Sequence, residues 1–359
     1  MNSTIRMRPS ALTVVVGLTL LSLVGVRPGP ASAAGSWQDA DGLVLSGNSK
    51  TNCVYPANSL AELRSFEEMT STTFNCVLMY NNEKPNWATW ENVWFFGDRS
   101  PDQNFMAWAQ AVPGRRFVIS QPMVPDDAPP DWRQLGAEGD YNGYASALAH
   151  NLVAEGLGSS VIRLGWEAND GADPESALGA GPAQYSEWAA YWRQIVTTMR
   201  TVPGAHFLFD WTVNQYWRPV PLQDWYPGNS AVDIIGIDGY DNGVYESGLS
   251  AAQRWEVLSG EADGFDAVAA FAAAHGKPLS IPEWGLSPPG AEGGAGDDPT
   301  YIEGLASIIK DDDVTYNSYF DRGASSGMLP LQDAPQSLAA YKRYIAPLGR
   351  AEVSPSGAG

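Results

Sequence analysis

Short and nearly continuous apolar runs recur along the chain, separated by segments with helical periodicity. Such runs, rich in β-branched residues, are typical of strands that are buried on both faces of a sheet. Eight of them are predicted to be strands. They cover residues 54–55, 73–80, 116–123, 161–167, 206–214, 232–240, 278–285 and 315–320.

The segments between these runs have the spacing of amphipathic helices. Residues 184–201 place large apolar side chains on one helical stripe, which includes Trp188 and Trp192, so both are expected in the core. Ser59 and Glu62 have the spacing of a capping box at the start of a helix. Further helices are predicted at residues 141–152, 265–274 and 301–309.

Strands that alternate with helices indicate βα units and a parallel sheet. Eight such units predict an α/β fold, a single-domain (β/α)8 TIM barrel over residues 34–350. An open doubly wound sheet is the alternative, but no strand is followed by the Gly-rich phosphate-binding turn that this fold uses. Residues 351–359 are small and polar and are predicted to form a disordered tail.

The first 33 residues have the three parts of a secretory signal peptide. Arg6 and Arg8 precede an apolar run, and Ala31-Ser32-Ala33 gives a cleavage site of small residues. A membrane anchor is the alternative, but the run is shorter than the roughly 20 residues that span a bilayer. We therefore expect a secreted, extracellular protein that leaves the membrane once the signal is removed.

The two cysteines, Cys53 and Cys76, both lie after the predicted cleavage site. An even pair in an exported protein favours one disulfide bond, and their two strands are neighbours in a (β/α)8 barrel. Two buried free thiols are the alternative. With three histidines in the whole chain and none near a cysteine, we expect no metal site.

Charge and aromatic content narrow the classes of partner. The formal net charge of −20 disfavours nucleic acid and anionic membranes, because an acidic surface repels phosphate groups. The chain holds 14 Trp, 15 Tyr and 11 Phe, an excess that suits either sugar stacking or an aromatic core. No cofactor is expected, and the protein is expected to act as a monomer.

Carboxylates follow apolar runs that would otherwise be buried. Glu167, Asp210, Asp238 and Glu283 all lie at the predicted carboxyl ends of strands, where barrel enzymes place their active sites. Glycoside hydrolysis needs two carboxyl groups, one protonated and one ionised. A separation of about 5–5.5 Å indicates retention and about 6.5–9.5 Å inversion, and sequence spacing does not fix this distance.

Three motifs resemble glycoside hydrolase family 26, a family in the large clan of retaining (β/α)8 glycosidases. Residues 163–171, RLGWEANDG, resemble the acid/base motif Arg-x-x-His-Glu-x-Asn-Gly of that family. Tyr226-Pro-Gly with residues 232–241, VDIIGIDGYD, is similar to its sixth-strand motif. Residues 277–285, KPLSIPEWG, are similar to the strand that carries its nucleophile. The resemblance extends over residues 73–348.

The resemblance implies a role for each matching residue. Glu167 is the expected general acid/base and Glu283 the expected nucleophile. Tyr240 is expected to hydrogen-bond Glu283, and Arg163 to lie beneath the site and hold Glu283 ionised; the alternative for Arg163 is to satisfy a buried carboxylate. The chain has Trp166 where the family usually has a histidine that touches substrate, so β-mannan, the commonest substrate of the family, is not assured.

Further residues are predicted to bind substrate. The motifs also suggest Asn169 and Asp238 as contacts, although Asp238 could instead cap or form a turn. Aromatic residues that end or follow strands predict an open groove lined by rings. These residues are Trp166, Trp211, Trp217, Tyr240 and Trp284. Residues 287–300 form a long Gly- and Pro-rich loop, either a mobile rim of the groove or a tolerated insertion.

Together these features predict a secreted, retaining and endo-acting O-glycosyl hydrolase. Its expected substrate is a polysaccharide with β-glycosidic bonds, of the β-mannan, β-xylan or β-glucan type. A non-catalytic carbohydrate-binding barrel is the alternative, disfavoured because both Glu167 and Glu283 are present. A serine esterase is also disfavoured, since the Gly323–Gly327 match to G-x-S-x-G has no histidine after it.

Overall fold

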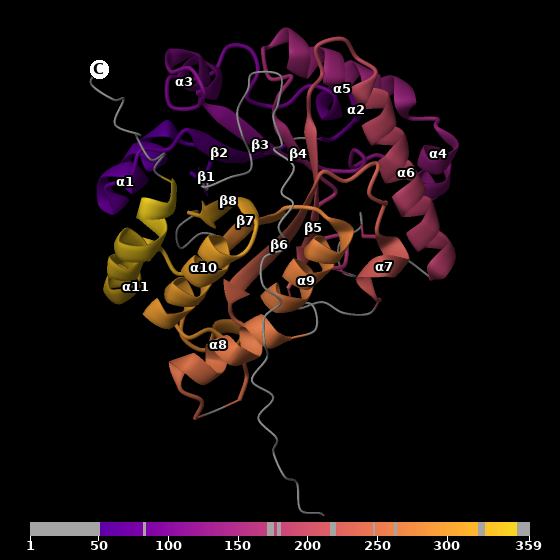
Figure 1. The fold of residues 1–359 in the computed structure, drawn as a ribbon. Helices are drawn as coiled ribbons and strands as arrows, with labels where there is room; N and C mark the ends of the chain where they lie inside the picture. The colour runs from indigo at the N-terminus through magenta and orange to yellow at the C-terminus, as the bar shows by residue number, and fades with distance from the viewer. Residues whose placement is uncertain are drawn as a thin grey trace, which may run out of the picture.

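The computed structural model describes residues 51–81, 84–170, 176–177, 181–215, 220–246, 248–261, 264–321 and 327–349. Eight parallel strands form a closed barrel in the order β1 to β8 (Figure 1). The strands are β1 (Thr51–Tyr55), β2 (Cys76–Tyr80), β3 (Arg116–Gln121), β4 (Val161–Leu164), β5 (Leu208–Asn214), β6 (Ile234–Asp241), β7 (Leu279–Leu286) and β8 (Val314–Phe320). Pairing of β1 with β8 closes the sheet, so the predicted (β/α)8 barrel is confirmed and the open sheet is excluded.

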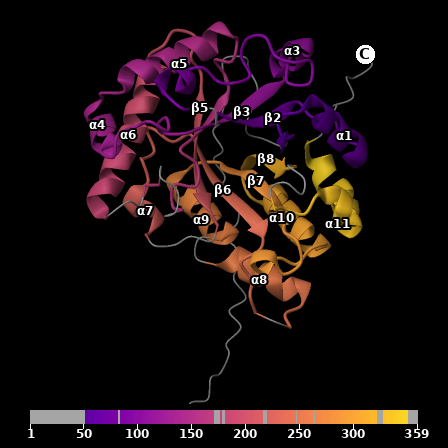
Figure 2. The same cartoon turned by 180° about the vertical axis from the view of Figure 1, so that it is seen from behind.

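Helices lie around the outside of the barrel, as the view from behind also shows (Figure 2). They are α1 (Leu60–Thr70), α2 (Trp87–Trp90), α3 (Phe105–Ala111), α4 (Trp132–Glu138), α5 (Asn142–Ala154), α6 (Pro182–Arg200), α7 (Leu222–Trp225), α8 (Ala251–Gly260), α9 (Phe265–His275), α10 (Pro299–Asp311) and α11 (Pro335–Ala340). Shorter helical turns are η1 (Ala291–Gly293), η3 (Leu331–Asp333), η4 (Tyr341–Ile345) and η5 (Ala346–Gly349). None of the helices in the described residues is long and apolar enough to cross a membrane.

The predicted helices occur where the sequence places them. Ser59 caps α1, where its hydroxyl accepts a hydrogen bond from the backbone N–H of Glu62. Trp188 and Trp192 of α6 are fully buried, as their stripe predicts. The indole of Trp192 donates to the carbonyl of Leu164 at 3.1 Å, which ties α6 to the carboxyl end of β4.

Alternation along the strands separates two apolar regions. One face packs against the helices, and the other fills the barrel interior with side chains that include Leu78, Val118 and Ile234. Cys53 of β1 and Cys76 of β2 form the predicted disulfide, with their Cα atoms 4.5 Å apart. The bond therefore joins the first two strands next to the point where the barrel closes.

Some sequence predictions concern residues outside the described ranges. These are the signal peptide, the tail at 351–359, Trp217 and the serine of the Gly323–Gly327 match. The long loop at 287–300 is described, and it is joined to the segment after β6. The carbonyl of Glu292 accepts from the N–H of Gly243 at 2.6 Å, and the carbonyl of Gly293 accepts from Arg254 at 2.8 Å.

Candidate active site

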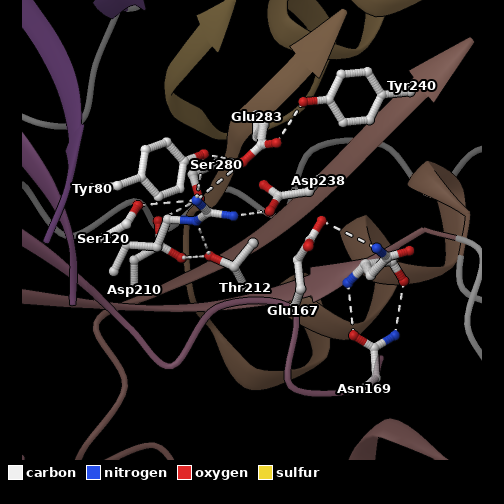
Figure 3. A network of polar contacts seen from close by, with 12 residues as sticks. Tyr80, Ser120, Glu167, Asn169, Asp210, Thr212, Asp238, Tyr240, Ser280 and Glu283 are labelled. Atoms are coloured by element: carbon white, nitrogen blue, oxygen red, sulfur yellow. Dashed lines mark hydrogen bonds and ion pairs between the residues drawn. The ribbon is translucent and has the colours of Figure 1, made fainter. Parts of the chain in front are cut away.

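Polar side chains gather at the carboxyl ends of the strands (Figure 3). Glu283 comes from β7, Tyr240 from β6, Tyr80 from β2 and Arg163 from β4, while Glu167 lies just after β4. This is the end of the barrel at which βα loops build active sites in this fold. The structure thus brings together Glu167, Glu283, Arg163 and Tyr240, the four residues predicted to be catalytic.

A bulge in β7 turns Glu283 toward the barrel interior. Gly236 and Gly239 of β6 pair with Ser280 and Trp284, so β7 has one more residue than β6 in this stretch. Pairing with β8 shows the same extra residue between Ile281 and Trp284. Pro282 has no N–H for the ladder and is suited to this irregularity. As a result Ser280 and Glu283 both reach the interior, although strict alternation would put them on opposite faces.

Three donors hold the carboxylate of Glu283, whose side chain is 12% exposed. The hydroxyl of Tyr240 donates to Oε1 at 2.5 Å. The hydroxyl of Tyr80 donates to Oε2, and Nη1 of Arg163 lies 3.4 Å from the same oxygen. Two hydroxyl donors and one guanidinium group therefore fix the orientation of this carboxyl group.

Arg163 lies fully buried beneath Glu283. It forms an ion pair with Asp238, and it also donates to the hydroxyls of Ser120 at 3.0 Å and Thr212 at 3.3 Å. Burial by itself would lower the pKa of Arg163, but Tyr80 and the carboxylate of Glu283 outweigh it and raise that pKa. A buried cation with these partners stays charged and supplies a fixed positive potential to the site.

A second buried carboxylate, Asp210 of β5, lies below Arg163. It accepts hydrogen bonds from Ser280 at 2.6 Å, Tyr316 at 2.5 Å and Thr212 at 3.1 Å. Burial raises the pKa of Asp210, and these hydrogen bonds oppose that rise. Because Thr212 contacts both Asp210 and Arg163, this layer fixes the orientation of the guanidinium group.

Glu167 lies in the turn that follows β4, which is a correction to the predicted strand at 161–167. The strand ends at Leu164 because Gly165 and Glu167 have positive φ angles of 51° and 53°. Such a φ is uncommon for a non-glycine residue and is found at functional sites. The turn is held where the N–H of Glu167 donates to the carbonyl of Thr212 at 3.1 Å.

Asn214, at the end of β5, contacts the carboxyl group of Glu167. Its amide donates to Oε1 of Glu167 at 3.1 Å. Asn169 holds Asn214 in place, since it donates to the Asn214 carbonyl at 2.8 Å and accepts from the Asn214 N–H at 2.7 Å. The loop after β4 and the end of β5 therefore position Glu167 jointly.

Two predicted substrate contacts are instead part of this framework. Asn169 is 1% exposed and braces Asn214. Asp238 is also 1% exposed and pairs with Arg163. Both side chains are thus almost fully buried and bonded within the protein, and their contact with substrate stays a prediction.

Tyr80 and Tyr240 keep their protons at the site. Burial raises the pKa of each phenol well above its ordinary value, and the nearby charge of Glu283 raises it further. Both hydroxyls are therefore donors to Glu283 across the whole pH range in which a glycosidase acts.

The predicted aromatic groove is only partly present. Trp166 and Tyr240 are half-buried at the mouth of the barrel, whereas Trp211 and Trp284 are fully buried. Trp211 packs on Trp225 with ring centroids 4.3 Å apart, and Trp284 lies 4.9 Å from Tyr319. The prediction that Trp211 and Trp284 line the groove is wrong, because Asp210 and Glu283 point inward and alternation turns their neighbours toward the helices.

Several residues of the site were not predicted from the sequence. Tyr80 ends a predicted strand, so the rule that drew attention to Glu283 would also have found it. Ser120, Thr212 and Ser280 lie inside strands and have no such signal. Across the described ranges, no group of three His, Cys, Asp or Glu side chains is arranged to hold a metal ion.

Solved structures similar to this barrel include bacterial mannanases. A modular endo-β-1,4-mannanase from Cellulomonas fimi is 18% identical, with a TM-score of 0.57 over 84% of this chain and 71% of that chain. A family 26 β-mannanase from Bacteroides ovatus is 12% identical, with a TM-score of 0.57 over 84% and 90% of the two chains. The catalytic domain of an endo-β-1,4-mannanase from Bacillus sp. JAMB-750 is 18% identical, with a TM-score of 0.55 over 85% and 84%. At these identities the likeness shows the fold.

A family model also matches part of the chain. The sequence model of glycosyl hydrolase family 26 matches residues 178–277, a stretch that lies between Glu167 and Glu283. This match confirms the resemblance to family 26 and the prediction of a glycosyl hydrolase. No curated protein matches the chain.

Proposed function

We propose that the protein is a secreted, retaining glycosidase in which Glu283 is the nucleophile and Glu167 the general acid/base. The observation that carries this proposal is the set of donors around Glu283. Arg163, Tyr80 and Tyr240 all contact its carboxyl group and fix its orientation at the mouth of the barrel, as a nucleophile needs. In Figure 3 the carboxyl group of Glu167 points toward the side of the site on which Glu283 lies.

The two carboxyl groups divide the reaction into two steps. In the first, Glu283 forms a bond to the anomeric carbon, the glycosidic bond breaks, and Glu167 gives its proton to the leaving oxygen. In the second, Glu167 takes a proton from water, the water oxygen bonds to the anomeric carbon, and Glu283 leaves as a carboxylate. The product keeps the configuration of the substrate because each step inverts it once.

We propose a β-linked polysaccharide as the substrate and endo-acting cleavage. The family match and the mannanase activity named for the similar structures support this class. Half-buried rings at the mouth, Trp166 and Tyr240, are suited to the apolar face of a sugar. Trp166 follows the strand that leads to Glu167, so it stands next to the proposed point of cleavage.

Secretion remains part of the proposal. It is supported by the signal-like residues 1–33 and is compatible with the Cys53–Cys76 disulfide, since such bonds persist in oxidising compartments. Mass spectrometry of the protein exported by its host would identify the first residue of the mature chain.

A substrate panel tests the proposed activity. The purified protein is incubated with β-mannan, β-1,4-xylan, β-1,3-xylan and mixed-linkage β-glucan, and the products are sized over time. We expect one of these polysaccharides to give oligosaccharides of mixed length early in the reaction, and Glu283→Ala to give none. Binding of a polysaccharide without any hydrolysis would contradict the proposal and favour a non-catalytic carbohydrate-binding barrel.

A further inference from the structure

Tyr80 is the last residue of β2, and its hydroxyl contacts both Arg163 and Glu283. Its hydroxyl accepts a hydrogen bond from Nη1 of Arg163 at 3.3 Å and donates its own proton to Oε2 of Glu283. Tyr240 donates to the other oxygen, Oε1, at 2.5 Å. Two tyrosines from distant strands therefore hold different oxygens of one carboxylate.

The donors are divided unequally between these two oxygens. Tyr80 and Arg163 both contact Oε2. Among the described residues, Oε1 accepts a hydrogen bond from Tyr240. An ionised carboxylate has about two acceptor positions on each oxygen. Both positions of Oε2 are thus occupied, and Oε1 keeps one lone pair with which to form a new bond.

The ring of Tyr80 is also fixed by its neighbours. It meets Tyr55 edge to face at 5.0 Å and Trp166 at 5.3 Å between ring centroids. Trp166 directly precedes Glu167. The side chain of Tyr80 therefore hydrogen-bonds Glu283 and also packs against the turn that carries Glu167. This packing limits the directions in which the hydroxyl of Tyr80 can point.

We propose that Tyr80 is a positioning residue that holds Oε2 of Glu283, so that Oε1 is the atom that bonds to the anomeric carbon. This inference rests on the proposed nucleophilic role of Glu283. When the C1–Oε1 bond forms and the leaving oxygen takes the proton of Glu167, Oε2 becomes the carbonyl oxygen of the glycosyl ester. Oε2 can still accept hydrogen bonds from Tyr80 and Arg163. When water displaces Glu283 from the anomeric carbon, the same two donors stabilise the carboxylate that is released.

Tyr80→Phe tests this role because it removes the hydroxyl and keeps the ring that packs on Trp166. We expect kcat to fall about 10- to 100-fold, the usual effect of losing a hydrogen bond to a charged group. KM should stay unchanged, since the hydroxyl contacts Glu283 and not the sugar.

Tyr341→Phe is the matched control. Tyr341 is fully buried in the core against Trp284, and its hydroxyl has no hydrogen-bond partner in the described part of the chain. This variant should keep the kinetics of the wild type. If Tyr80→Phe folds poorly, replacement of Tyr80 by a fluorotyrosine keeps a hydroxyl donor of nearly the same shape, and kcat should then stay close to the wild-type value.

The Tyr80 proposal and the proposed function can fail separately. Glu283→Ala is assayed beside Tyr80→Phe, with and without azide as an external nucleophile. An active Glu283→Ala variant would overturn the proposed function. If Glu283→Ala is inactive and rescued by azide, while folded Tyr80→Phe has the wild-type kcat, the role of Tyr80 alone is overturned.

Discussion

Glu283 and Glu167 lie at the same end of the barrel but in different local structures. Glu283 belongs to β7 and is held by Arg163 and two tyrosine hydroxyls, whereas Glu167 belongs to a turn and accepts from the neutral amide of Asn214. The charged partner lies beside the proposed nucleophile and the neutral amide beside the proposed acid/base. The surroundings of the two glutamates therefore differ in charge, as the two proposed roles require.

The surroundings of the two glutamates also differ in how they are built. Around Glu283 the partners come from β2, β4 and β6, so the closed barrel itself sets the geometry. Around Glu167 the partners are Thr212 and Asn214 of β5, the next strand, together with Asn169 in the same loop. Glu283 is therefore positioned by strands that are far apart in the sequence and that the closed barrel brings together. Glu167 is positioned by contacts with one adjacent strand.

Apart from replacement of Glu283 itself, replacement of Glu167 should have the largest effect on activity. Glu167→Ala should lower kcat/KM for the polysaccharide at least about 100-fold, the typical contribution of a general acid. Aryl glycosides with good leaving groups should lose much less in the first step, because their oxygen needs little protonation. Kinetics on a series of aryl leaving groups measures this difference, and an equal loss on all substrates would contradict the role of Glu167.

Removing the cation beneath Glu283 should cost stability as well as activity. Arg163→Met leaves Asp238 and Glu283 without their buried partner, so unfolding in urea should show a loss of about 3–5 kcal/mol. The control is Arg200→Met, because the ion pair of Arg200 with Asp233 at 2.8 Å is partly exposed. That variant should lose about 1 kcal/mol or less. Equal losses in the two variants would show that Arg163 does not hold the site together.

Two tryptophans next to the glutamates should respond in opposite ways. Trp284→Ala removes a fully buried ring and should cost about 3–5 kcal/mol of stability with KM unchanged. Trp166→Ala removes a half-buried ring at the mouth and should raise KM roughly 2- to 10-fold with little effect on the melting temperature. Thermal unfolding and steady-state kinetics of both variants test this contrast. A raised KM for Trp284→Ala would contradict it and indicate that Trp284 contacts substrate.

The smallest expected effect is on the pH dependence of stability and comes from Asp241, a carboxylate without the tyrosine donors that hold Glu283. Burial, together with the charge of Asp298, raises the pKa of Asp241 to about 7, against the lowering influence of Arg254. The folded state then binds this proton more tightly than the unfolded state, so stability falls as pH rises from about 4 to about 7. Asp241→Asn should reduce this fall in melting temperature, measured by calorimetry at several pH values. The same slope in both proteins would contradict the assignment.

The sequence predicts the barrel well because each of its strands is a local apolar run. All eight predicted strands overlap β1 to β8, and Cys76 was placed correctly on β2, while Cys53 was placed next to the first strand and in fact lies on β1. The end of β4 was predicted three residues too late, because the positive φ angles of Gly165 and Glu167 have no signature in an apolar pattern. Element type depends on local pattern, and strand ends depend on contacts with neighbouring strands.

Site residues that lie in sequence motifs were predicted, and those that only the closed barrel brings to the site were missed. Glu167, Glu283, Arg163 and Tyr240 come from motifs, whereas Tyr80 reaches Glu283 across 203 residues of sequence. Trp211 and Trp284 were placed in the groove because a strand that is apolar on both faces does not show which side chains point inward. The inward carboxylates Asp210 and Glu283 decide this, since adjacent strand residues point to opposite faces.

The configuration of the first product tests the central claim most directly. Proton NMR follows the anomeric signals during the first minutes of hydrolysis of the polysaccharide identified in the panel. Two successive displacements at one anomeric carbon, with Glu283 as the nucleophile, predict that the β-anomer forms first and converts slowly to the α-anomer. Initial formation of the α-anomer would show a single displacement by water, and Glu283 would then not be the nucleophile.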